Sequence, residues 1–276
     1  MPRFSGGTLI LGPQTPVALA LNALVRTGRA RLATAGLRAL PSRVASPFLR
    51  RCLEPHRQLA ERKAEFARET AGTLSVMSSV NFLGPPQIGP GTGSMFPDAV
   101  SGFQRLGDIA GAARIVLLPD SLPAFFLASA SVALEAKVRG TAWETLYELG
   151  WADMARALVE ALPKATLLVL TPEGAALRSR AAIGHIFQDA ATALDPLALT
   201  RPAVSETGNA VLKRLEQTGT PDERMLGELY ASFAVRPDPL EIRTRLGIEK
   251  ITATLLDQRF ADDMDAIRSL PRTEVI

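Results

Sequence analysis

Four short, uninterrupted apolar runs, separated by long segments with helical patterning, constrain the fold of this chain more than any other feature. The runs are TLILG (8–12), TLSVMSS (73–79), ARIVLLP (113–119) and ATLLVLT (165–171). A strand without polar alternation is typical of a sheet that is buried on both faces. Because the strands alternate with helices, we predict an α/β fold with a parallel central sheet flanked by helices.

The segments between these runs have the apolar spacing of helices. They predict helices at 16–27, 30–39, 47–69, 122–138, 142–161 and 173–193. The tail from Ser205 to about Leu270 predicts a helical C-terminal region, and TEVI (273–276) is a candidate last strand. No internal repeat or low-complexity linker divides the chain, so we expect one domain over residues 1–276.

Composition narrows the class of protein. The 276 residues are 47% hydrophobic, which is ample for a core. Cys52 is the single cysteine, so an internal disulfide is excluded, and with only His56 and His185 beside it we expect no metal site. No apolar run reaches the ~18 residues of a membrane span or the length of a secretory signal. We therefore expect a soluble, cytoplasmic protein without an integral membrane segment.

Positive charge is concentrated at the start of the chain. Residues 1–69 contain 12 Lys and Arg against 4 Glu, a balance of +8, so the remainder carries −5 of the formal net charge of +3. Such a segment indicates an anionic ligand, an anionic membrane surface or a solvated helical face, and we favour the last. The arginines are not interleaved with a stacking platform of aromatic residues, so we do not expect a nucleic-acid partner.

Ligands of parallel α/β sheets lie at the carboxyl ends of the strands, here the turns after residues 12, 79 and 119. At the first turn Thr15 is a predicted N-cap with Pro16 at the first helical position, and free amides there would favour an anion. A phosphate-binding loop also needs a second glycine and a lysine after Gly12, and both are missing. The turn is therefore either an altered anion site or a plain capped turn.

Several segments, in order along the chain, resemble motifs of the bacterial sulfotransferases that use 3′-phosphoadenosine 5′-phosphosulfate (PAPS), a family with a P-loop-like α/β fold. SVNFLGP (79–85) resembles the family's S-x-E-N-x-x-G, SMFPDAV (94–100) its L-Y-P-D-A, and RPAVS (201–205) its R-x-S-L-S. Segments 113–130, 151–173 and 255–271 resemble its later strands and helices. The resemblance extends over most of the chain and implies a P-loop/sulfotransferase-like fold.

The resemblance also implies a donor site whose important positions differ here. The loop lysine falls on Thr15, and the Gly-Thr-Thr cradle that follows falls on apolar residues 17–19. The position of the general base is Val80, and Asp120, or Pro119 in a shifted register, replaces an arginine that grips the 3′-phosphate. We therefore assign no catalytic residue, and expect a non-catalytic binding protein whose partner is a glycan, a cell-envelope intermediate or another protein.

The alternative is a divergent sulfotransferase that transfers a sulfuryl group from PAPS to a hydroxyl of a glycan or small molecule. Its donor, or the product 3′-phosphoadenosine 5′-phosphate (PAP), would contact a set of candidate cofactor-binding residues. These are Gly12, Gln14, Thr15, Ser121 and Arg201. Glu173 follows the fourth run at an edge where ligands bind, although its place as an acid in the first turn of a helix is the simpler explanation. The Gly- and Pro-rich segment 84–94 is the predicted specificity loop.

Overall fold

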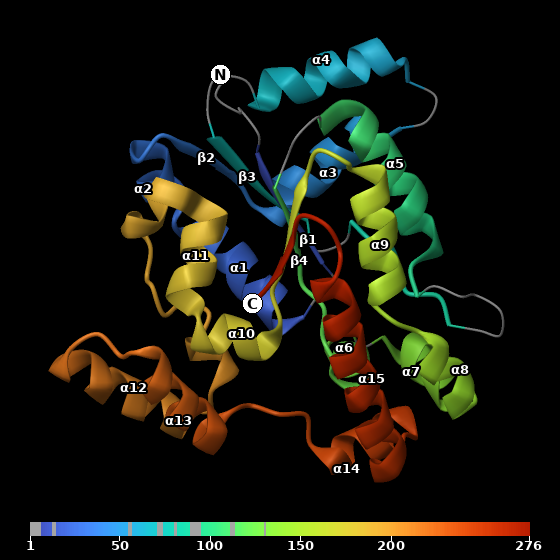
Figure 1. Ribbon diagram of the computed structural model, residues 1–276, viewed down its shortest axis with the longest axis vertical. Coiled ribbons are helices and arrows are strands. Elements are labelled where there is room, and N and C mark those ends of the chain that lie inside the picture. The colour runs from blue at the N-terminus through green and yellow to red at the C-terminus, as the bar shows by residue number, and fades with distance from the viewer. Residues whose placement is uncertain are drawn as a thin grey trace.

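The computed structural model describes residues 7–12, 15–54, 57–70, 74–79, 82–88, 95–110, 114–129 and 131–276. Its strands form one parallel sheet in the order β2-β3-β1-β4-β5-β6, which confirms the predicted α/β fold (Figure 1). The strands are β1 (Thr8–Leu11), β2 (Leu37–Leu40), β3 (Leu74–Ser79), β4 (Arg114–Leu117), β5 (Thr166–Val169) and β6 (Thr273–Val275). The four apolar runs supply β1, β3, β4 and β5, and the candidate last strand is β6.

Helices cover both faces of the sheet and form most of the C-terminal region. They are α1 (Pro16–Thr27), α2 (Arg29–Thr34), α3 (Ser42–Cys52), α4 (Leu59–Thr70), α5 (Pro97–Ala110), α6 (Leu122–Ala128), α7 (Val132–Arg139), α8 (Trp143–Glu148), α9 (Ala152–Ala161), α10 (Pro172–Leu177), α11 (Ser179–Phe187), α12 (Glu206–Thr218), α13 (Glu223–Phe233), α14 (Pro239–Glu241) and α15 (Lys250–Arg268). The bounds of α1 match the predicted helix. In the described residues, no helix is both long and apolar enough to cross a membrane.

The prediction of a helix at 30–39 is wrong in its second half. Helix α2 ends at Thr34, and Gly36 turns the chain with a φ of +77°, a left-handed conformation that glycine adopts without a steric penalty. Leu37–Leu40 then forms edge strand β2, which pairs in parallel with β3. Arg38 points to solvent between buried neighbours, so this strand lacks the continuous apolar signature of the others.

Four longer predicted helices are wrong in their continuity. The segments 47–69, 122–138 and 142–161 each contain two shorter helices, and 173–193 contains two helices followed by a 3-10 helix at Gln188–Ala193. Ser131 begins α7 as an N-cap, because its hydroxyl accepts a hydrogen bond from the N–H of Leu134 at 3.2 Å. Close packing explains the break after α8, since a Cβ at Gly150 would lie 2.8 Å from a carboxylate oxygen of Asp263. Helix α5, which the pattern did not indicate, lies between β3 and β4.

Alternate side chains of the strands enter two separate hydrophobic cores. Leu9 and Leu11 of β1 belong to the core under α3, α5, α9 and α15, whereas Ile10 belongs to the core under α1, α2 and α11. The same alternation holds for β4 and β5. Figure 1 shows α1, α2, α10 and α11 on one side of the sheet and α3, α5 and α9 on the other. Burial on both faces explains why the strands read as continuous apolar runs.

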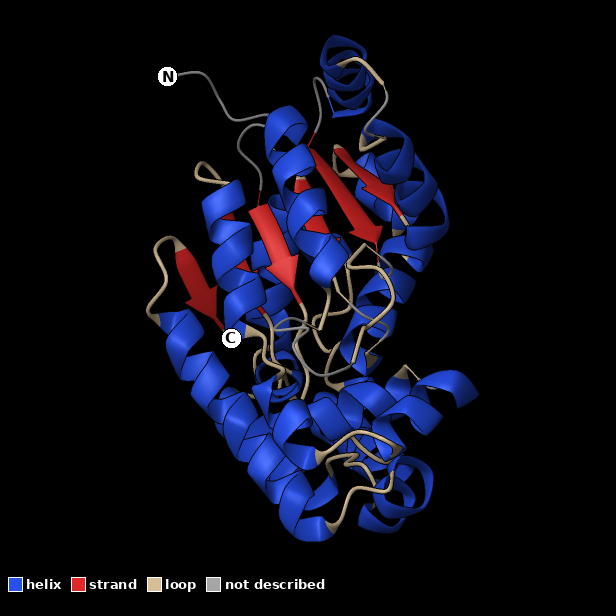
Figure 2. Ribbon diagram, turned by 90° about the vertical axis from the view of Figure 1, so that its right-hand side faces the viewer, coloured by secondary structure: helices blue, strands red, loops and turns tan. Residues whose placement is uncertain are grey.

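The strand order places a crevice at the carboxyl ends of β1 and β4. The chain leaves β1 toward β2 and β3 but leaves β4 toward β5 and β6, so the loops after these two neighbouring strands diverge. The C-terminal helices gather beyond the carboxyl ends of the strands, below the arrowheads in Figure 2. This arrangement covers the crevice with residues that come from the end of the chain.

Candidate functional site

The turn after β1 is closed by its own side chains. Thr15 is 1% exposed, and its hydroxyl accepts a hydrogen bond from the N–H of Ala18 at 3.3 Å, as an N-cap does. Pro16 has no N–H, and the N–H of Leu19 donates to the carbonyl of Thr15, so Val17 holds the one amide of this first turn without a partner in the helix. A phosphate cradle needs several free amides, and the described part of this turn, from Thr15 into α1, does not provide them.

Of the other predicted cofactor-binding residues, Ser121 lines the second cavity together with Pro16 and Val17 at the start of α1, whereas Arg201 is engaged elsewhere. Gly12 packs closely on Leu118, since a Cβ at Gly12 would lie 3.0 Å from that of Leu118. Arg201 binds Asp195 through Nε at 2.9 Å and Glu216 through both terminal nitrogens at 3.2 and 2.7 Å. These bonds raise the pKa of Arg201 and occupy its guanidinium. Gln14 lies outside the described residues, as does Val80.

Thr15 offers a direct test of the structural reading of this turn. Replacing Thr15 by alanine is expected to lower the free energy of unfolding by about 1 kcal/mol, because the N–H of Ala18 loses its acceptor. The comparable variant Thr27→Ala removes an exposed hydroxyl near the end of the same helix and should change stability by less than about 0.5 kcal/mol. Urea denaturation measures both, and equal effects would contradict the capping role.

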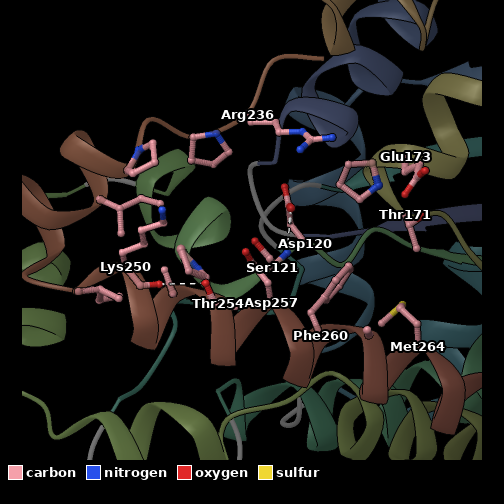
Figure 3. Close-up of a pocket in the computed structure, with 18 of the residues that line it drawn as sticks. Asp120, Ser121, Thr171, Glu173, Arg236, Lys250, Thr254, Asp257, Phe260 and Met264 are labelled. Carbon is pink, nitrogen blue, oxygen red and sulfur yellow. Dashed lines mark hydrogen bonds between the residues drawn. The ribbon is translucent and has the colours of Figure 1, made fainter. Parts of the chain in front are cut away.

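Ser121 is the predicted residue that lines a cavity. The cavity, here called the β4–α15 cavity, has a volume of about 620 Å³ (Figure 3). Its base is formed by Asp120 and Ser121, and its walls come from α10, α13, α15 and the segment 235–238 that crosses over it. The residues of these walls include Thr171, Glu173, Tyr230, Arg236, Lys250, Thr254, Asp257 and Phe260. A second cavity of about 490 Å³ adjoins it and shares Asp120, Ser121, Tyr230 and Arg236.

Asp120 is positioned by one hydrogen bond to its carboxylate and one to its backbone carbonyl. It follows β4, and the N–H of Ser121, the residue before α6, donates to Asp120 Oδ1 at 2.8 Å. The indole Nε1–H of Trp151 donates to the backbone carbonyl of Asp120 at 2.8 Å. Trp151 is itself fixed, because its backbone N–H donates to Asp263 Oδ2 at 2.7 Å. The base of the cavity is therefore a rigid part of the fold.

The carboxyl group of Asp120 is held in an environment that disfavours its charge. The residue is 8% exposed, and burial raises the pKa of Asp120 to about 7, with repulsion from Asp257 adding to the effect and the N–H of Ser121 opposing it. Burial also raises the pKa of Asp257, while a hydrogen bond from the hydroxyl of Ser121 lowers it. Among the described residues, no neighbouring cation lowers the pKa of either carboxyl group. Asp120, Ser121 and Asp257 thus share one end of the cavity.

Charged groups of both signs surround the opening of the cavity. Arg236 and Lys250 are exposed and form no ion pair with another described residue. Arg268, which also lines the cavity, binds Asp265 on the same helix. Tyr230 adds a phenol whose pKa is raised by burial and by Glu173. The cavity can therefore offer a deep carboxyl pair, an aromatic wall and two unpaired cations to one ligand.

The basic first part of the chain lies away from this cavity. Helices α3 and α4, which carry many of its arginines, lie at the opposite end of the molecule from α14 (Figure 1). Glu65 accepts hydrogen bonds from Arg57 at 2.6 Å and from Arg51 at 3.4 Å, so part of the positive charge is paired locally. The described residues contain no group of three His, Cys, Asp or Glu side chains that could hold a metal ion.

The residues that sequence patterns did not indicate come from the C-terminal helices. Asp257 and Lys250 lie on α15, Tyr230 on α13 and Arg236 between α13 and α14. No local motif marks them, because each reaches the cavity only through the packing of these helices across the sheet edge.

Comparison of the chain with models of protein families, with curated proteins and with solved structures finds no match.

Proposed function

We propose that this chain is a non-catalytic binding protein whose small polar ligand lies in the β4–α15 cavity. One observation carries this proposal. Asp120 is a buried carboxyl group at the base of a cavity, and its second oxygen has no hydrogen-bond donor among the described residues. This second oxygen is open to the cavity, so a ligand there can supply a hydrogen-bond donor that the described residues do not.

The turn after β1 does not fit the phosphates of PAPS. Its side chains cap the helix or enter the core, and Asp120, where the related enzymes are expected to have an arginine, would repel a phosphate. We therefore keep the resemblance to sulfotransferases as a proposal about ancestry and fold. The cavity volume suits a small molecule or one sugar unit of a glycan or cell-envelope intermediate. The solitary Cys52 is consistent with a reducing compartment, and we propose the cytoplasm.

Tyr230 provides a reporter for ligand binding. The chain has two tyrosines, so protein labelled with 3-fluorotyrosine gives two ¹⁹F NMR signals, which the variant Tyr147→Phe assigns. We expect a mixture of amino acids, amines, sugars and sugar phosphates to shift the signal of Tyr230, which lines the cavity, and to leave that of Tyr147 in place. Fractionation of the mixture then identifies the ligand.

A variant that fills the cavity makes this test specific. Thr254 lies in the cavity wall and donates to a backbone carbonyl four residues earlier, at 3.1 Å. Thr244 makes the same kind of bond at 2.7 Å but does not line the cavity. Thr254→Trp should abolish the shift of Tyr230 and Thr244→Trp should preserve it. A shift that survives in Thr254→Trp, or no shift with wild-type protein, contradicts the proposed site.

Titration with PAP tests the proposal that the turn after β1 does not hold the phosphates of a sulfotransferase donor. We expect calorimetry to detect no binding at millimolar PAP, because the sequence of this turn contains no lysine or arginine and the described first turn of α1 leaves one amide unpaired. Micromolar binding at both low and moderate salt would show that other residues hold the phosphates, and would favour the second candidate function described next.

The second candidate is a divergent sulfotransferase, and one observation favours it. A general base is most effective when its pKa lies near the working pH, and Asp120 has a pKa of about 7 at the base of a cavity. In this role it would accept the proton of an acceptor hydroxyl. Release of PAP from PAPS in the presence of phenol and sugar acceptors, lost in Asp120→Asn, would support it. Under our first proposal no release above the buffer control is expected.

A further inference from the structure

The deep end of the β4–α15 cavity has the features of a site for a positively charged group. Asp120 and Asp257 approach it from different elements, the loop after β4 and helix α15, and Ser121 lies between them (Figure 3). The N–H of Ser121 donates to Asp120 Oδ1, and Ser121 and Asp257 line the same end of the cavity, so the two carboxyl groups face one region of it. No described cation serves as their partner.

The outer part of the cavity has the opposite character. Once the pair Arg268 and Asp265 is set aside, the cations of the lining are Arg236 and Lys250, both without an ion pair among the described residues. Lys250 and Asp257 lie on the same face of α15, seven residues or about 10 Å apart along its axis. Arg236 reaches over Asp120 from the segment on the other side (Figure 3). One ligand can therefore meet negative charge at the base and positive charge at the opening.

We propose that the ligand of the β4–α15 cavity is a small zwitterion, whose ammonium group lies between Asp120 and Asp257 and whose anionic group faces Arg236 and Lys250. This inference rests on the proposed function and names the class of ligand. Ammonium donates three hydrogen bonds and can therefore satisfy both carboxyl groups and the backbone near them. Its charge also removes the repulsion between the two acids, which a neutral hydroxyl does not.

Three matched compounds test the inference. The zwitterion is 3-aminopropanesulfonate, 3-hydroxypropanesulfonate replaces its ammonium by a hydroxyl, and propylamine lacks the anion. We expect calorimetry at pH 8 to show at least tenfold tighter binding of the aminosulfonate than of either other compound. The two-carbon analogue, taurine, and the four-carbon analogue extend the test to other spacings. Equal or tighter binding of the hydroxyl compounds overturns the proposal.

Variants locate each charge of the ligand. Asp120→Asn should weaken the aminosulfonate at least tenfold at pH 8, whereas Asp262→Asn, which alters an exposed carboxylate of α15 outside the lining, should leave the affinity unchanged. Arg236→Gln should weaken the aminosulfonate and leave propylamine unaffected, because propylamine has no group for Arg236 to bind. A loss of propylamine binding in Arg236→Gln would contradict the assigned orientation.

Binding should also depend on pH. Between pH 6 and pH 8 the ammonium and the sulfonate keep their charges, while Asp120 ionises about its pKa of about 7, so affinity should rise about tenfold. The charged or titratable groups that face this region are Asp257 on α15, Glu173 on α10, Tyr230 on α13 and Arg236. In Asp120→Asn the rise should disappear, and its persistence would contradict the role of Asp120.

The two proposals fail in different ways. If other compounds shift the ¹⁹F signal of Tyr230 and Thr254→Trp blocks them, but no aminosulfonate binds, the binding site stands and the zwitterion is wrong. If neither the mixture nor the aminosulfonates shift Tyr230, both proposals are wrong.

Discussion

Replacing Asp120 by asparagine is expected to stabilise the protein by about 4 kcal/mol at pH 8 and to change its stability little near pH 4. Burial raises the pKa of Asp120 from 3.8 to about 7, so the folded state binds a proton that the unfolded chain releases above pH 3.8. The contribution of Asp120 to the free energy of unfolding therefore falls as the pH rises from about 4 to 7. Each unit of difference between the folded and unfolded pKa corresponds to about 1.4 kcal/mol. Asparagine stays neutral throughout and can still accept the N–H of Ser121.

Urea denaturation of both proteins at pH 4 and pH 8 measures this difference, and unrelated titrations cancel in the comparison. Asp262→Asn is the control, because Asp262 is exposed and accepts a hydrogen bond from Gln258 at 3.1 Å. Its effect should stay within about 0.5 kcal/mol at both pH values. A difference for Asp120→Asn that is the same at pH 4 and pH 8 would contradict the perturbed pKa.

A larger stabilisation by Asp120→Asn at pH 8 than at pH 4 would show that the charge of Asp120 destabilises the fold at the place where we propose that a ligand binds. A protein under selection for stability alone would replace a buried, uncompensated carboxyl group, and proteins retain such groups at functional sites. Trp151 holds the backbone of Asp120 in place, and its replacement is also expected to have a large effect.

Trp151→Ala is expected to lower the free energy of unfolding by about 3–5 kcal/mol. The side chain is 1% exposed and its ring centroid lies 5.9 Å from that of Phe96 and 5.8 Å from that of Phe125, so truncation leaves a large cavity in the core. The backbone carbonyl of Asp120 also loses the indole N–H that donates to it. Denaturation followed by circular dichroism measures the loss.

Trp143 is the matched control for this variant. It is 45% exposed, so Trp143→Ala should change stability by less than about 1 kcal/mol. Trp151→Phe separates packing from hydrogen bonding: it keeps most of the ring, and its expected cost of about 1 kcal/mol reflects the lost bond to Asp120. Equal losses for Trp143→Ala and Trp151→Ala would contradict the described core.

Local sequence patterns were sufficient to predict four central strands of the sheet and the helix cap in the turn after β1. Strands buried on both faces must be apolar at successive positions, so β1, β3, β4 and β5 could be predicted from the residues that form them. The cap formed by Thr15 involves atoms within one helical turn, and it too was predictable. Edge strand β2 was missed because Arg38 faces solvent, and α8 and α9 were joined because the contact of Gly150 with Asp263 is distant in sequence.

The residues of the cavity were only partly predictable from the sequence. The sequence placed Ser121 and Asp120 after a strand, at the edge where ligands bind, and it placed Glu173 at the next edge. It did not assign Asp257, Tyr230 or Arg236 to the same cavity, and it included Arg201, whose side chain the structure shows bound to Asp195 and Glu216.

By itself, then, the sequence determined the parallel sheet apart from its edge strand β2, the first helix and the residues that follow β1, β3, β4 and β5, because these depend on neighbours a few positions apart. The tertiary structure decided which charges share a cavity and that Asp120 titrates near neutral pH. Burial and the approach of α15 produce both results. These arise only when the C-terminal helices pack across the end of the sheet, and no short stretch of sequence records that packing.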